Sequence, residues 1–481
     1  MITRFSAAVP SPLARRLGKH LLRTDGQEDC CFVLWRPATG ARRTTAVLVD
    51  VVLPLEGERI VHGTVDLTSA YFLRSAILAA ERGCGVGLIH SHPQGHGWQR
   101  LNQVDHDAET SFAAQAFAIT DRPLLGMTFA EGDGGHSARS YRPLHAESVR
   151  VVGEEFTVTF NSLLLPTPTV TSAQQRSLSA WGQQTQDTLA RLHVGVVGTG
   201  SVGMLVVEAL ARTGIGRLTL FDFDTVETVN LDRLLHATSR DARAKRPKVH
   251  LAAREARRAA TAPAFQVTAL EASITEPDGF AVAADCDVLF SCVDRPWPRH
   301  VLNQLAYAHL IPVVDGGVSV NARSGSLQGA EWRAHIAAPG RACLECLGQY
   351  DSAYVPMERD GLLEDPSYIT GLPPSHPMRR KENVFVFSTA AAAAELTQFI
   401  TMVAAPGGVS DNGAHLYHLA TGTLDRRTEG CEPGCPYNTT LLALGDAAPA
   451  VTGRHLAAER ARNTFRSHFT RLAHRWREPR S

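Results

Sequence analysis

The stretch HVGVVGTGSVG, residues 193–203, decides the fold of the larger part of this chain. An apolar, strand-like run leads directly into Gly198, Gly200 and Gly203, and a helix is expected from Val202 to Thr213. Such glycines permit a tight turn and a close backbone approach, and the N-terminus of the helix offers N–H groups to a phosphate. The stretch therefore predicts a nucleotide-binding strand–turn–helix unit.

Strand-like and helical segments alternate around this stretch, from about residue 174 to 440. Strands are expected at His193–Val197, Arg217–Phe221 and Val288–Ser291. Strands that alternate with helices favour a parallel, doubly wound sheet, so we predict an α/β domain of the Rossmann type.

Two carboxylates end the second of these strands. Asp222 and Asp224 lie in FDFD, directly after the apolar run. A carboxylate in this place can bind the ribose hydroxyls of a nucleotide. Taken alone, the pattern fits an NAD-linked dehydrogenase equally well.

The next segment, DTVETVNLDR at residues 224–233, resembles the DxDxVExSNLxRQ motif of E1-like enzymes, the MoeB/ThiF superfamily. In the strand-end motif of that family, Arg295 stands here in place of an Asn. The lead-in helix of the family is matched by QQRSLSAWGQQTQDTL. The residues that match the family are Asn230, Arg233, Lys248, Asp294, Arg299 and Arg176.

The resemblance implies that a carboxylate attacks the α-phosphate of ATP and expels pyrophosphate. Arg233, Lys248 and Arg176 would surround the phosphates, because negative charge builds up there. Asp294 would bind Mg²⁺, a cation that prefers oxygen ligands. Because the family places an arginine such as Arg176 at the ATP of a partner subunit, a homodimer is expected.

Four of the nine cysteines form two pairs, Cys343-x-x-Cys346 and Cys431-x-x-x-Cys435. Two such thiolate pairs suit a structural zinc ion, and the E1-like family usually has one. Buried thiols or redox partners are the alternative. In the E1-like enzymes that form a thioester, the nucleophilic cysteine lies in the crossover region between the two pairs. Here that region, residues 347–430, holds no cysteine, which excludes a thioester nucleophile at this place. Cys286 and Cys292, in or near an apolar strand, are expected to be buried.

A second pattern lies near the N-terminus, in GLIHSHP. His90 and His92 are two residues apart on an expected strand, Val86–Ile89 and its continuation, so both imidazoles point to one side. Asp105 follows at the start of a helical segment. Two histidines and one carboxylate leave a position for water on a tetrahedral catalytic zinc.

These residues resemble the JAB/MPN+ (JAMM) metalloprotease motif, in which a Glu, then His-x-His-Pro, then Ser-x-x-Asp recur. The resemblance makes Glu28 the general base. Asn102 stands in place of the Ser that stabilises the oxyanion, and its amide can donate a hydrogen bond in the same way. Asp107 is a competing third ligand, but Asp105 is favoured because Asn102 then takes the place of the Ser. A catalytically inactive MPN scaffold is the alternative.

Composition limits the class of protein. Hydrophobic residues make up 44% of the 481 residues and the net charge is zero, which fits a folded soluble chain that binds neither nucleic acid nor an acidic membrane. We expect no signal peptide or membrane span, and a cytoplasmic location. The predicted order is a JAB/MPN α+β domain with a mixed sheet (1–160), a linker (161–173), the E1-like domain (174–440) and a basic helical tail (441–481).

The two resemblances together suggest one function. The E1-like domain would adenylate the C-terminus of a ubiquitin-like β-grasp protein, using ATP and Mg²⁺. The JAMM domain would trim or deconjugate the same modifier with zinc, and an E2-like or sulfur-carrier protein could be a further partner. Two alternatives stay open: adenylation of a short peptide or sulfur carrier in cofactor or natural-product biosynthesis, and an inactive MPN scaffold that recruits the modifier.

Overall fold

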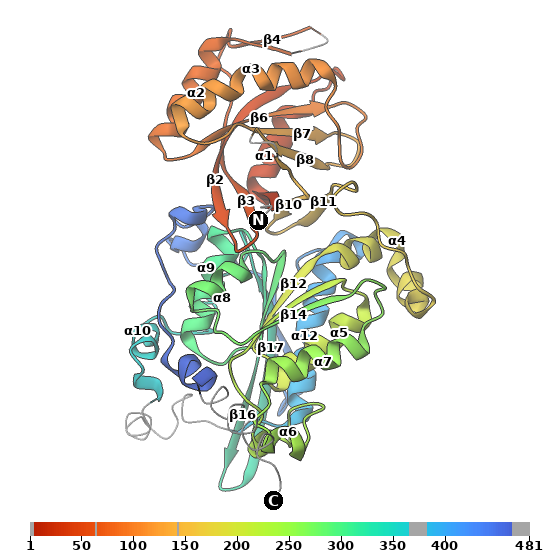
Figure 1. Cartoon of the computed structure of the whole chain (residues 1–481), viewed down its shortest axis with the longest axis vertical. Coiled ribbons are helices and arrows are strands. Elements are labelled where there is room, and N and C mark those ends of the chain that lie inside the picture. Colours follow the sequence, from red (N-terminus) through yellow and green to blue (C-terminus); the bar gives the residue numbers. More distant parts are fainter. Residues whose placement is uncertain (1–3, 63–64, 142–143, 365–381, 464–481) are drawn as a thin grey trace, which may run out of the picture.

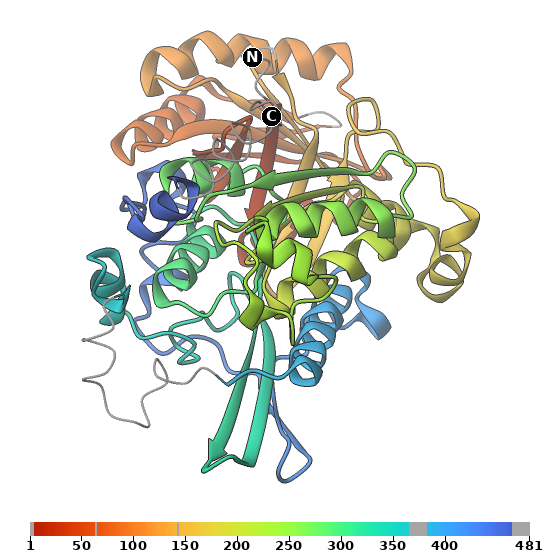
Figure 2. The same cartoon turned by 60° about the horizontal axis from the view of Figure 1, so that its bottom comes forward.

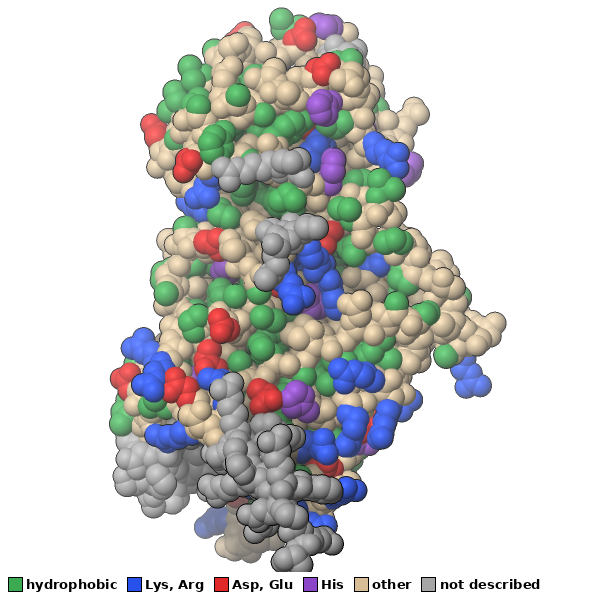
Figure 3. Space-filling model, in the orientation of Figure 1, with side chains coloured by type: hydrophobic (Ala, Val, Ile, Leu, Met, Phe, Trp, Pro, Cys, Tyr) green, Lys and Arg blue, Asp and Glu red, His purple; other side chains and the backbone are tan. Residues whose placement is uncertain are grey.

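The computed structural model describes residues 4–62, 65–141, 144–364 and 382–463. They form two units that follow one another along the long axis of the molecule (Figure 1). The N-terminal unit is built on a nine-stranded sheet and the C-terminal unit on an eight-stranded sheet. On the face shown in Figure 3, the Lys and Arg side chains gather mainly over the C-terminal unit, with Asp and Glu among them.

The sheet of the N-terminal unit is mixed, in the order β11-β10-β1-β3-β2-β6-β7-β8-β9. The pairs β1–β10, β1–β3 and β6–β7 are parallel, and the other pairs are antiparallel. The strands are β1 (Arg4–Pro10), β2 (Cys30–Thr39), β3 (Arg43–Val52), β6 (Gly85–His92), β7 (Leu125–Ala130), β8 (His136–Ser140), β9 (Leu144–His145), β10 (Ser148–Val152) and β11 (Phe156–Phe160).

Three helices and a small hairpin complete this unit: α1 (Ser11–Leu21), α2 (Ser69–Glu81), α3 (Gln103–Thr120), and β4 (Arg59–Val61) with β5 (Val65–Leu67). Strand β2 shows why the sheet is covered on both faces. Phe32 and Leu34 pack with residues of α2, while Val33 packs with residues of α1. A strand that is buried on both faces has a continuous apolar sequence, which CCFVLW is.

The C-terminal unit has the strand order β14-β13-β12-β15-β16-β17-β18-β19. The first five strands in this order are parallel and the last three pair antiparallel. The strands are β12 (His193–Val197), β13 (Arg217–Phe221), β14 (Gln266–Leu270), β15 (Val288–Ser291), β16 (Val313–Arg323), β17 (Ser326–Ala337), β18 (Ala414–His418) and β19 (Thr423–Arg427). The predicted Rossmann-type α/β domain is therefore present, with an antiparallel extension that was not predicted.

Helices cover both faces of this sheet. Residues of α5, α7 and α12 belong to one buried cluster, and residues of α8 and α9 belong to the other. The helices are α4 (Gln175–Arg191), α5 (Ser201–Thr213), α6 (Ser239–Arg243), α7 (Lys248–Ala259), α8 (Pro277–Ala283), α9 (Pro296–Ala308), α10 (Tyr354–Arg359) and α12 (Phe385–Ala404). Short 3₁₀ turns are η1 (Ser172–Gln174), η2 (Thr228–Asn230), η3 (Leu362–Glu364), η5 (Pro406–Gly408), η6 (Pro436–Asn438) and η7 (Gly445–Ala447).

Helix α12 is apolar and long enough to cross a membrane by length and composition alone. Here it packs against β16, β17 and α5, and Phe399 on its buried side contacts Phe290 of β15. The core helix of a soluble protein passes the same test of length and composition. The hairpin of β16 and β17 extends beyond the body of the C-terminal unit (Figure 2).

The predicted helical tail is helical over only part of the residues that the structure describes. Residues 441–455 run in turns and extended backbone, with η7 among them, and helix begins only at residue 456. Gly445 and Gly453, together with Pro449, disfavour a helix in this stretch. The helix continues to residue 463, and the rest of the predicted tail, 464–481, lies outside the described residues.

The two units are joined through a buried ion cluster. Arg43 of β3 and Arg150 of β10 each donate a hydrogen bond of 2.6 Å to the same oxygen of Asp287, in the C-terminal unit. The other oxygen of Asp287 accepts from the backbone N–H of His193 at 2.9 Å. Burial would raise the pKa of Asp287, but the guanidinium groups of Arg43 and Arg150 lower it well below its usual range.

We expect Asp287→Ala to destabilise the protein by about 3–5 kcal/mol, because two buried guanidinium groups lose their carboxylate. Chemical denaturation of the full chain measures this change in the free energy of unfolding. The control is Arg16→Ala, which removes an exposed ion pair with Asp50 and is expected to cost less than about 1 kcal/mol. Equal stability of the two variants would contradict the importance of the buried cluster.

Candidate nucleotide and metal sites

The three glycines of the turn after β12 differ in how much room a side chain would have. Gly198 has a φ of +87°, a conformation that side chains disfavour, and a Cβ there would lie 2.5 Å from the carbonyl oxygen of Cys292. A Cβ on Gly203 would lie 1.9 Å from the carbonyl oxygen of Gly198. A Cβ on Gly200 would meet no atom of the described residues within 4 Å. The backbone of Gly200 therefore faces open space at the N-terminus of α5.

Asp222 fastens this turn to the end of β13. Its Oδ2 atom accepts hydrogen bonds from the backbone N–H of Thr199 at 2.7 Å and from the Thr199 hydroxyl at 2.9 Å. Burial raises the pKa of Asp222, although the nearby ammonium of Lys248 lowers it. Asp222 thus holds the glycine turn in place.

Lys248 lies at the first position of α7, beside the carboxylates. Its Nζ atom donates to Asp224 at 2.8 Å, and its side chain is only 14% exposed. Burial lowers the pKa of Lys248, but Asp222, Asp224 and Asp294 outweigh that effect and raise it. The structure therefore brings one ammonium and three predicted carboxylates to the carboxyl edge of the sheet, where open α/β sheets bind ligands.

Asn230 and Arg233 hold the turn in which they lie. The Asn230 side-chain oxygen accepts from the backbone N–H of Glu227 at 3.0 Å. Arg233 donates to the carbonyl oxygen of Val229 at 2.6 Å and to Asp232 at 2.9 Å. In this conformation both predicted nucleotide ligands are turned toward their own loop.

The two arginines near Asp294 have separate partners. Arg295 donates to the carbonyl oxygen of Leu363 at 3.3 Å. Arg299 donates to Asp315 at 3.4 Å and to the carbonyl oxygen of Gln349 at 3.1 Å. Asp315 is fully buried and also accepts from Ser291 at 2.6 Å.

Asn383, just before α12, contacts the glycine turn, and the sequence did not predict this contact. Its side-chain N–H donates to the hydroxyl of Ser201 at 3.0 Å, and its oxygen accepts from Ser388 at 2.9 Å. Ser201 is the first residue of α5, so Asn383 connects the segment before α12 with the glycine turn. The Val384–Phe385 boundary could have drawn attention to Asn383, because Asn is common beside helix starts.

Arg176 lies on α4, which projects to the side of the C-terminal unit (Figure 1). The residue is exposed, and Gly182 has non-helical torsion angles within the same helix. The structure does not bring Arg176 together with the other predicted nucleotide ligands of its own chain. Its place away from them is compatible with a role at another subunit.

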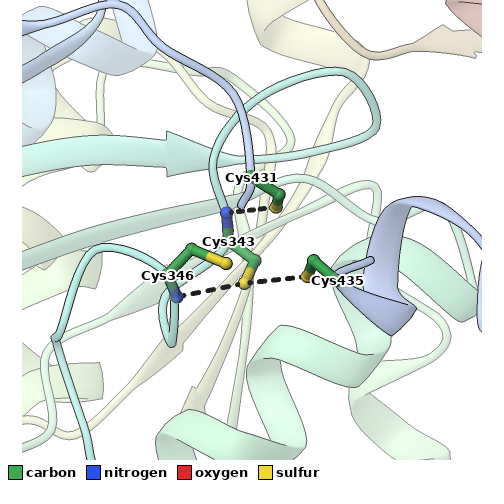
Figure 4. Close-up of side chains that lie close together, drawn as sticks. All are labelled: Cys343, Cys346, Cys431 and Cys435. Carbon is green, nitrogen blue, oxygen red and sulfur yellow. Dashed lines mark hydrogen bonds between the residues drawn. The ribbon is translucent and has the colours of Figure 1, made fainter. Parts of the chain in front are cut away.

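The four paired cysteines converge (Figure 4). The ligand atoms of Cys343, Cys346, Cys431 and Cys435 all lie within 4.8 Å of one another. The backbone N–H of Cys343 donates to the sulfur of Cys431 at 3.1 Å, and that of Cys346 donates to the sulfur of Cys343 at 3.3 Å. Four converging sulfurs with N–H donors fit a tetrahedral zinc ion.

Cys286 and Cys292 are both unsuited to nucleophilic chemistry. Burial raises the pKa of Cys286 to about 12. Burial also raises the pKa of Cys292 well above its ordinary value, and its sulfur lies 3.4 Å from Glu395. A thiol that stays protonated is a weak nucleophile.

In the N-terminal unit, His90 and His92 lie together at the end of β6. Their Nε2 atoms are 3.0 Å apart, and each is 3.5 Å from Oδ2 of Asp105. Although buried, this oxygen has no hydrogen-bond partner in the described part of the chain. Two imidazole nitrogens and one carboxylate oxygen that meet at one point fit a catalytic zinc ion with an open position.

Glu28 lies beside these three residues. Burial raises its pKa, His90 and His92 lower it, and the carboxylates of Asp105 and Glu131 raise it again. The next residue, Asp29, is anchored to the histidine strand, because its backbone N–H donates to Ser91 Oγ at 3.0 Å and its carbonyl oxygen accepts from Ser91 N–H at 2.8 Å. These bonds hold the backbone next to Glu28 against the strand that carries His90 and His92.

Asn102 is the N-cap of α3. Its side-chain oxygen accepts from the backbone N–H of Asp105 at 2.9 Å, which leaves its amide N–H₂ as a donor. Ser and Asn are both strong N-cap residues, so the exchange of Ser for Asn preserves the start of this helix. Asp107 is 68% exposed and accepts from Gln103 at 2.8 Å, so it does not join the histidines.

Comparisons with known proteins match the C-terminal unit to one family. A match to the ThiF family covers residues 172–428, more than half of the chain. The chain therefore belongs to the ThiF family. It is 36% identical over 134 residues to the molybdopterin-synthase adenylyltransferase of Escherichia coli, covering 27% of this chain and 51% of that protein.

A second relative is the ubiquitin-like modifier-activating enzyme 5 of Dictyostelium discoideum, 30% identical over 174 residues, covering 34% of this chain and 42% of that protein. The chain thus spans about half or less of these relatives. Among solved structures, E. coli MccB with MccA-N7isoASN aligns with 56% of this chain and 75% of that one, at 18% identity and a TM-score of 0.43. A score this low adds nothing to the family match.

We expect the purified full chain to contain two zinc ions, measured by inductively coupled plasma mass spectrometry. Asp105→Asn is expected to lose one ion and keep the other, because a carboxamide is a poor zinc ligand. The matched control Asp107→Asn is expected to keep both, and Cys346→Ser is expected to lose the ion at the cysteines. One zinc ion in the wild-type chain, or loss of zinc in Asp107→Asn, would contradict this assignment.

Proposed function

We propose that the C-terminal unit adenylates the C-terminal carboxylate of a ubiquitin-like β-grasp protein, and that the N-terminal unit is a JAB/MPN+ domain that cleaves amide bonds of the same modifier. The observation that carries the first half is the group of Lys248 and its carboxylates, of which Asp222 is bonded to Thr199 in the glycine turn. The second half rests on the convergence of His90, His92 and Asp105.

For adenylation, the glycine turn and the N-terminus of α5 supply backbone N–H groups for the triphosphate of ATP. Asp222 and Asp224 stand where ribose hydroxyls bind in this type of sheet. Lys248, paired with Asp224 at 2.8 Å, would turn its ammonium to the phosphates once ATP is bound. It would there oppose the charge that builds up as pyrophosphate leaves.

Magnesium would neutralise the phosphates and orient them when bound. Asp294 offers a carboxylate for it near Lys248, since the two groups interact electrostatically. Asn230 and Arg233 would have to leave their present contacts within their own turn to reach the nucleotide. We propose that nucleotide binding rearranges this turn.

We expect Lys248→Ala to lower the rate of ATP–pyrophosphate exchange by about 100-fold or more, because the phosphates lose a preorganised cation. The matched control is Lys245→Ala, which removes an exposed pair with Glu227 and is expected to leave exchange unchanged. Exchange is measured with a β-grasp protein, a sulfur carrier and a short peptide in turn. If wild-type protein exchanges with none of these, the proposed adenylation is wrong.

The same panel separates the possible substrates. Exchange with the β-grasp protein supports the proposal, whereas exchange with the peptide alone would favour the alternative of natural-product or cofactor biosynthesis. Residues 347–430 hold no cysteine, and the thiols of Cys286 and Cys292 stay protonated. We therefore propose that the chain forms an acyl-adenylate and no thioester of its own, and that an E2-like protein, a sulfur carrier or an amine then takes the acyl group.

For cleavage, zinc at His90, His92 and Asp105 would supply Lewis acidity toward water and the scissile carbonyl. Glu28 is placed to accept a proton from water and to pass it to the departing amine. Because burial raises the pKa of Glu28 toward neutral pH, the carboxyl group can both accept and release a proton more readily. The free N–H₂ of Asn102 is proposed to donate to the oxyanion, in place of a serine hydroxyl.

We expect Glu28→Gln to keep both zinc ions and to lose cleavage by at least about 100-fold, because an amide cannot accept the proton. The measurement is release of a C-terminal extension, or of an amide-linked target, from the β-grasp protein. Asp107→Asn serves as control and is expected to cleave at the wild-type rate. Retained cleavage in Glu28→Gln would remove this residue from the mechanism, and no cleavage by the wild type would favour an inactive scaffold.

The remaining features of the proposal concern assembly and location. We propose a homodimer through the C-terminal unit, in which exposed Arg176 reaches the ATP of the other subunit. The balanced charge gives no reason to propose a nucleic-acid or membrane partner. We propose a reducing, cytoplasmic location, because four of the nine cysteines converge on one site and four others are buried.

A further inference from the structure

A segment beyond the family match lies along the edge of the proposed nucleotide site. We call residues 449–462 the C-terminal strap; the family match ends at residue 428. Its first contacts are with α9, because Gln304 donates to the carbonyl oxygen of Pro449 at 2.8 Å and Trp297 Nε1 donates to that of Val451 at 2.8 Å. The strap therefore begins on the helix that follows Asp294.

The strap then reaches the loop that follows β14. The backbone N–H of Gly453 donates to the carbonyl oxygen of Thr275 at 2.8 Å. Arg462 forms a bidentate ion pair with Glu276, with distances of 2.8 Å and 2.6 Å. These contacts hold both ends of the strap across the carboxyl edge of the sheet, between α9 and the end of β14.

His455 is the side chain of the strap that contacts residues after both β13 and β15. Its ring stacks on Trp297 with an interplanar angle of 9° and a centroid distance of 5.6 Å. It also contacts Phe223, with centroids 4.8 Å apart. His455 and Trp297 are both buried, and the partly exposed ring of Phe223 packs against His455 at an interplanar angle of 50°.

The two rings that His455 contacts belong to the chain segments that carry the proposed nucleotide ligands. Phe223 lies between Asp222 and Asp224 in the sequence, and Trp297 lies in the first turn of α9, three residues after Asp294. If the stack is lost, these two loops can move relative to each other. Asp222, Asp224 and Asp294 can bind one nucleotide and its cation together only if the distance between the two loops is kept.

We propose that His455 is a positioning residue for the nucleotide site: through Phe223 and Trp297 it fixes Asp222, Asp224 and Asp294 relative to one another. This inference rests on the proposed ATP-dependent function of the C-terminal unit. It assigns to the strap, which lies outside the ThiF match, a part in binding ATP. His455 does not itself touch the nucleotide in this proposal.

A second role of His455 must be separated from the first. Its Nδ1 atom accepts a hydrogen bond of 3.1 Å from the backbone N–H of Ala458, so the residue also caps the helix at 456–463. His455→Asn keeps a capping side chain and removes the aromatic stack. His455→Phe keeps the stack and removes the cap. The two variants therefore test the two roles one at a time.

We expect His455→Asn to raise the KM for ATP in pyrophosphate exchange by about three- to tenfold, with a smaller change in kcat, because an aromatic contact of this kind is lost. His455→Phe is expected to keep the wild-type KM. Arg454→Ala, which removes an exposed ion pair with Glu459 from the same strap, is the control and is expected to change neither constant. Direct titration of each protein with MgATP gives the matching dissociation constants.

An unchanged KM in His455→Asn, or an equal rise in His455→Phe, would overturn the positioning role and leave only the helix cap. In either case a wild-type chain that binds MgATP and exchanges pyrophosphate would still support the proposed function. A wild-type chain that binds no MgATP would overturn both. The titration with wild-type protein thus distinguishes failure of the inference from failure of the function.

Discussion

The buried carboxylate of Asp287 links the two units of this protein. It accepts hydrogen bonds from Arg43 and Arg150 of the N-terminal unit and from the backbone of β12 in its own unit. None of these groups can reach water, so each depends on the others for its hydrogen bonds. The neighbouring carboxylate of Asp285 extends the contact, since it accepts from the backbone N–H groups of Arg42 and Arg43.

This contact lies at the amino ends of the parallel strands, opposite the carboxyl ends that carry the glycine turn. Asp287 and His193 lie at the beginnings of β15 and β12, whereas the glycine turn and Asp294 follow the ends of these strands. On the other side of the contact, β2 runs from Cys30, which pairs with His90, to Thr39 at the junction. Ten residues of strand span roughly 33 Å. The two candidate sites therefore lie on opposite sides of the junction between the two units.

The sequence predicted the local features well, because periodicity and glycine spacing report on a strand and the turn that follows it. His90 and His92 could be assigned to one side of a strand, and the HVGVVGTGSVG stretch could be assigned to a nucleotide-type turn. Strand β2 extends to Thr39, beyond the apolar run CCFVLW, because its pairing with β3 continues there. Helix α1 was not predicted, although Leu13, Leu17 and Leu21 are spaced four residues apart and lie on its buried face.

Features that depend on distant parts of the chain could not be predicted in this way. Arg43, Arg150 and Asp287 have no sequence pattern in common, and any one of them alone resembles a surface charge. The same holds for Asn383 and Ser201, which are 182 positions apart. The antiparallel extension β17–β19 escaped prediction because the pattern of alternating strands and helices stops before it, while the hydrogen bonds of the sheet continue.

The end of the described chain connects the junction with the nucleotide edge. Asp446 accepts from the backbone N–H and the hydroxyl of Thr39 at the tip of β2, at 2.8 Å and 2.6 Å. A few residues later the strap begins along α9 and ends on Glu276. One short segment thus binds the N-terminal unit, the helix after Asp294 and the loop after β14. Because these contacts are made with elements far away in the sequence, the local pattern of residues 441–463 alone could not have predicted the place of this segment.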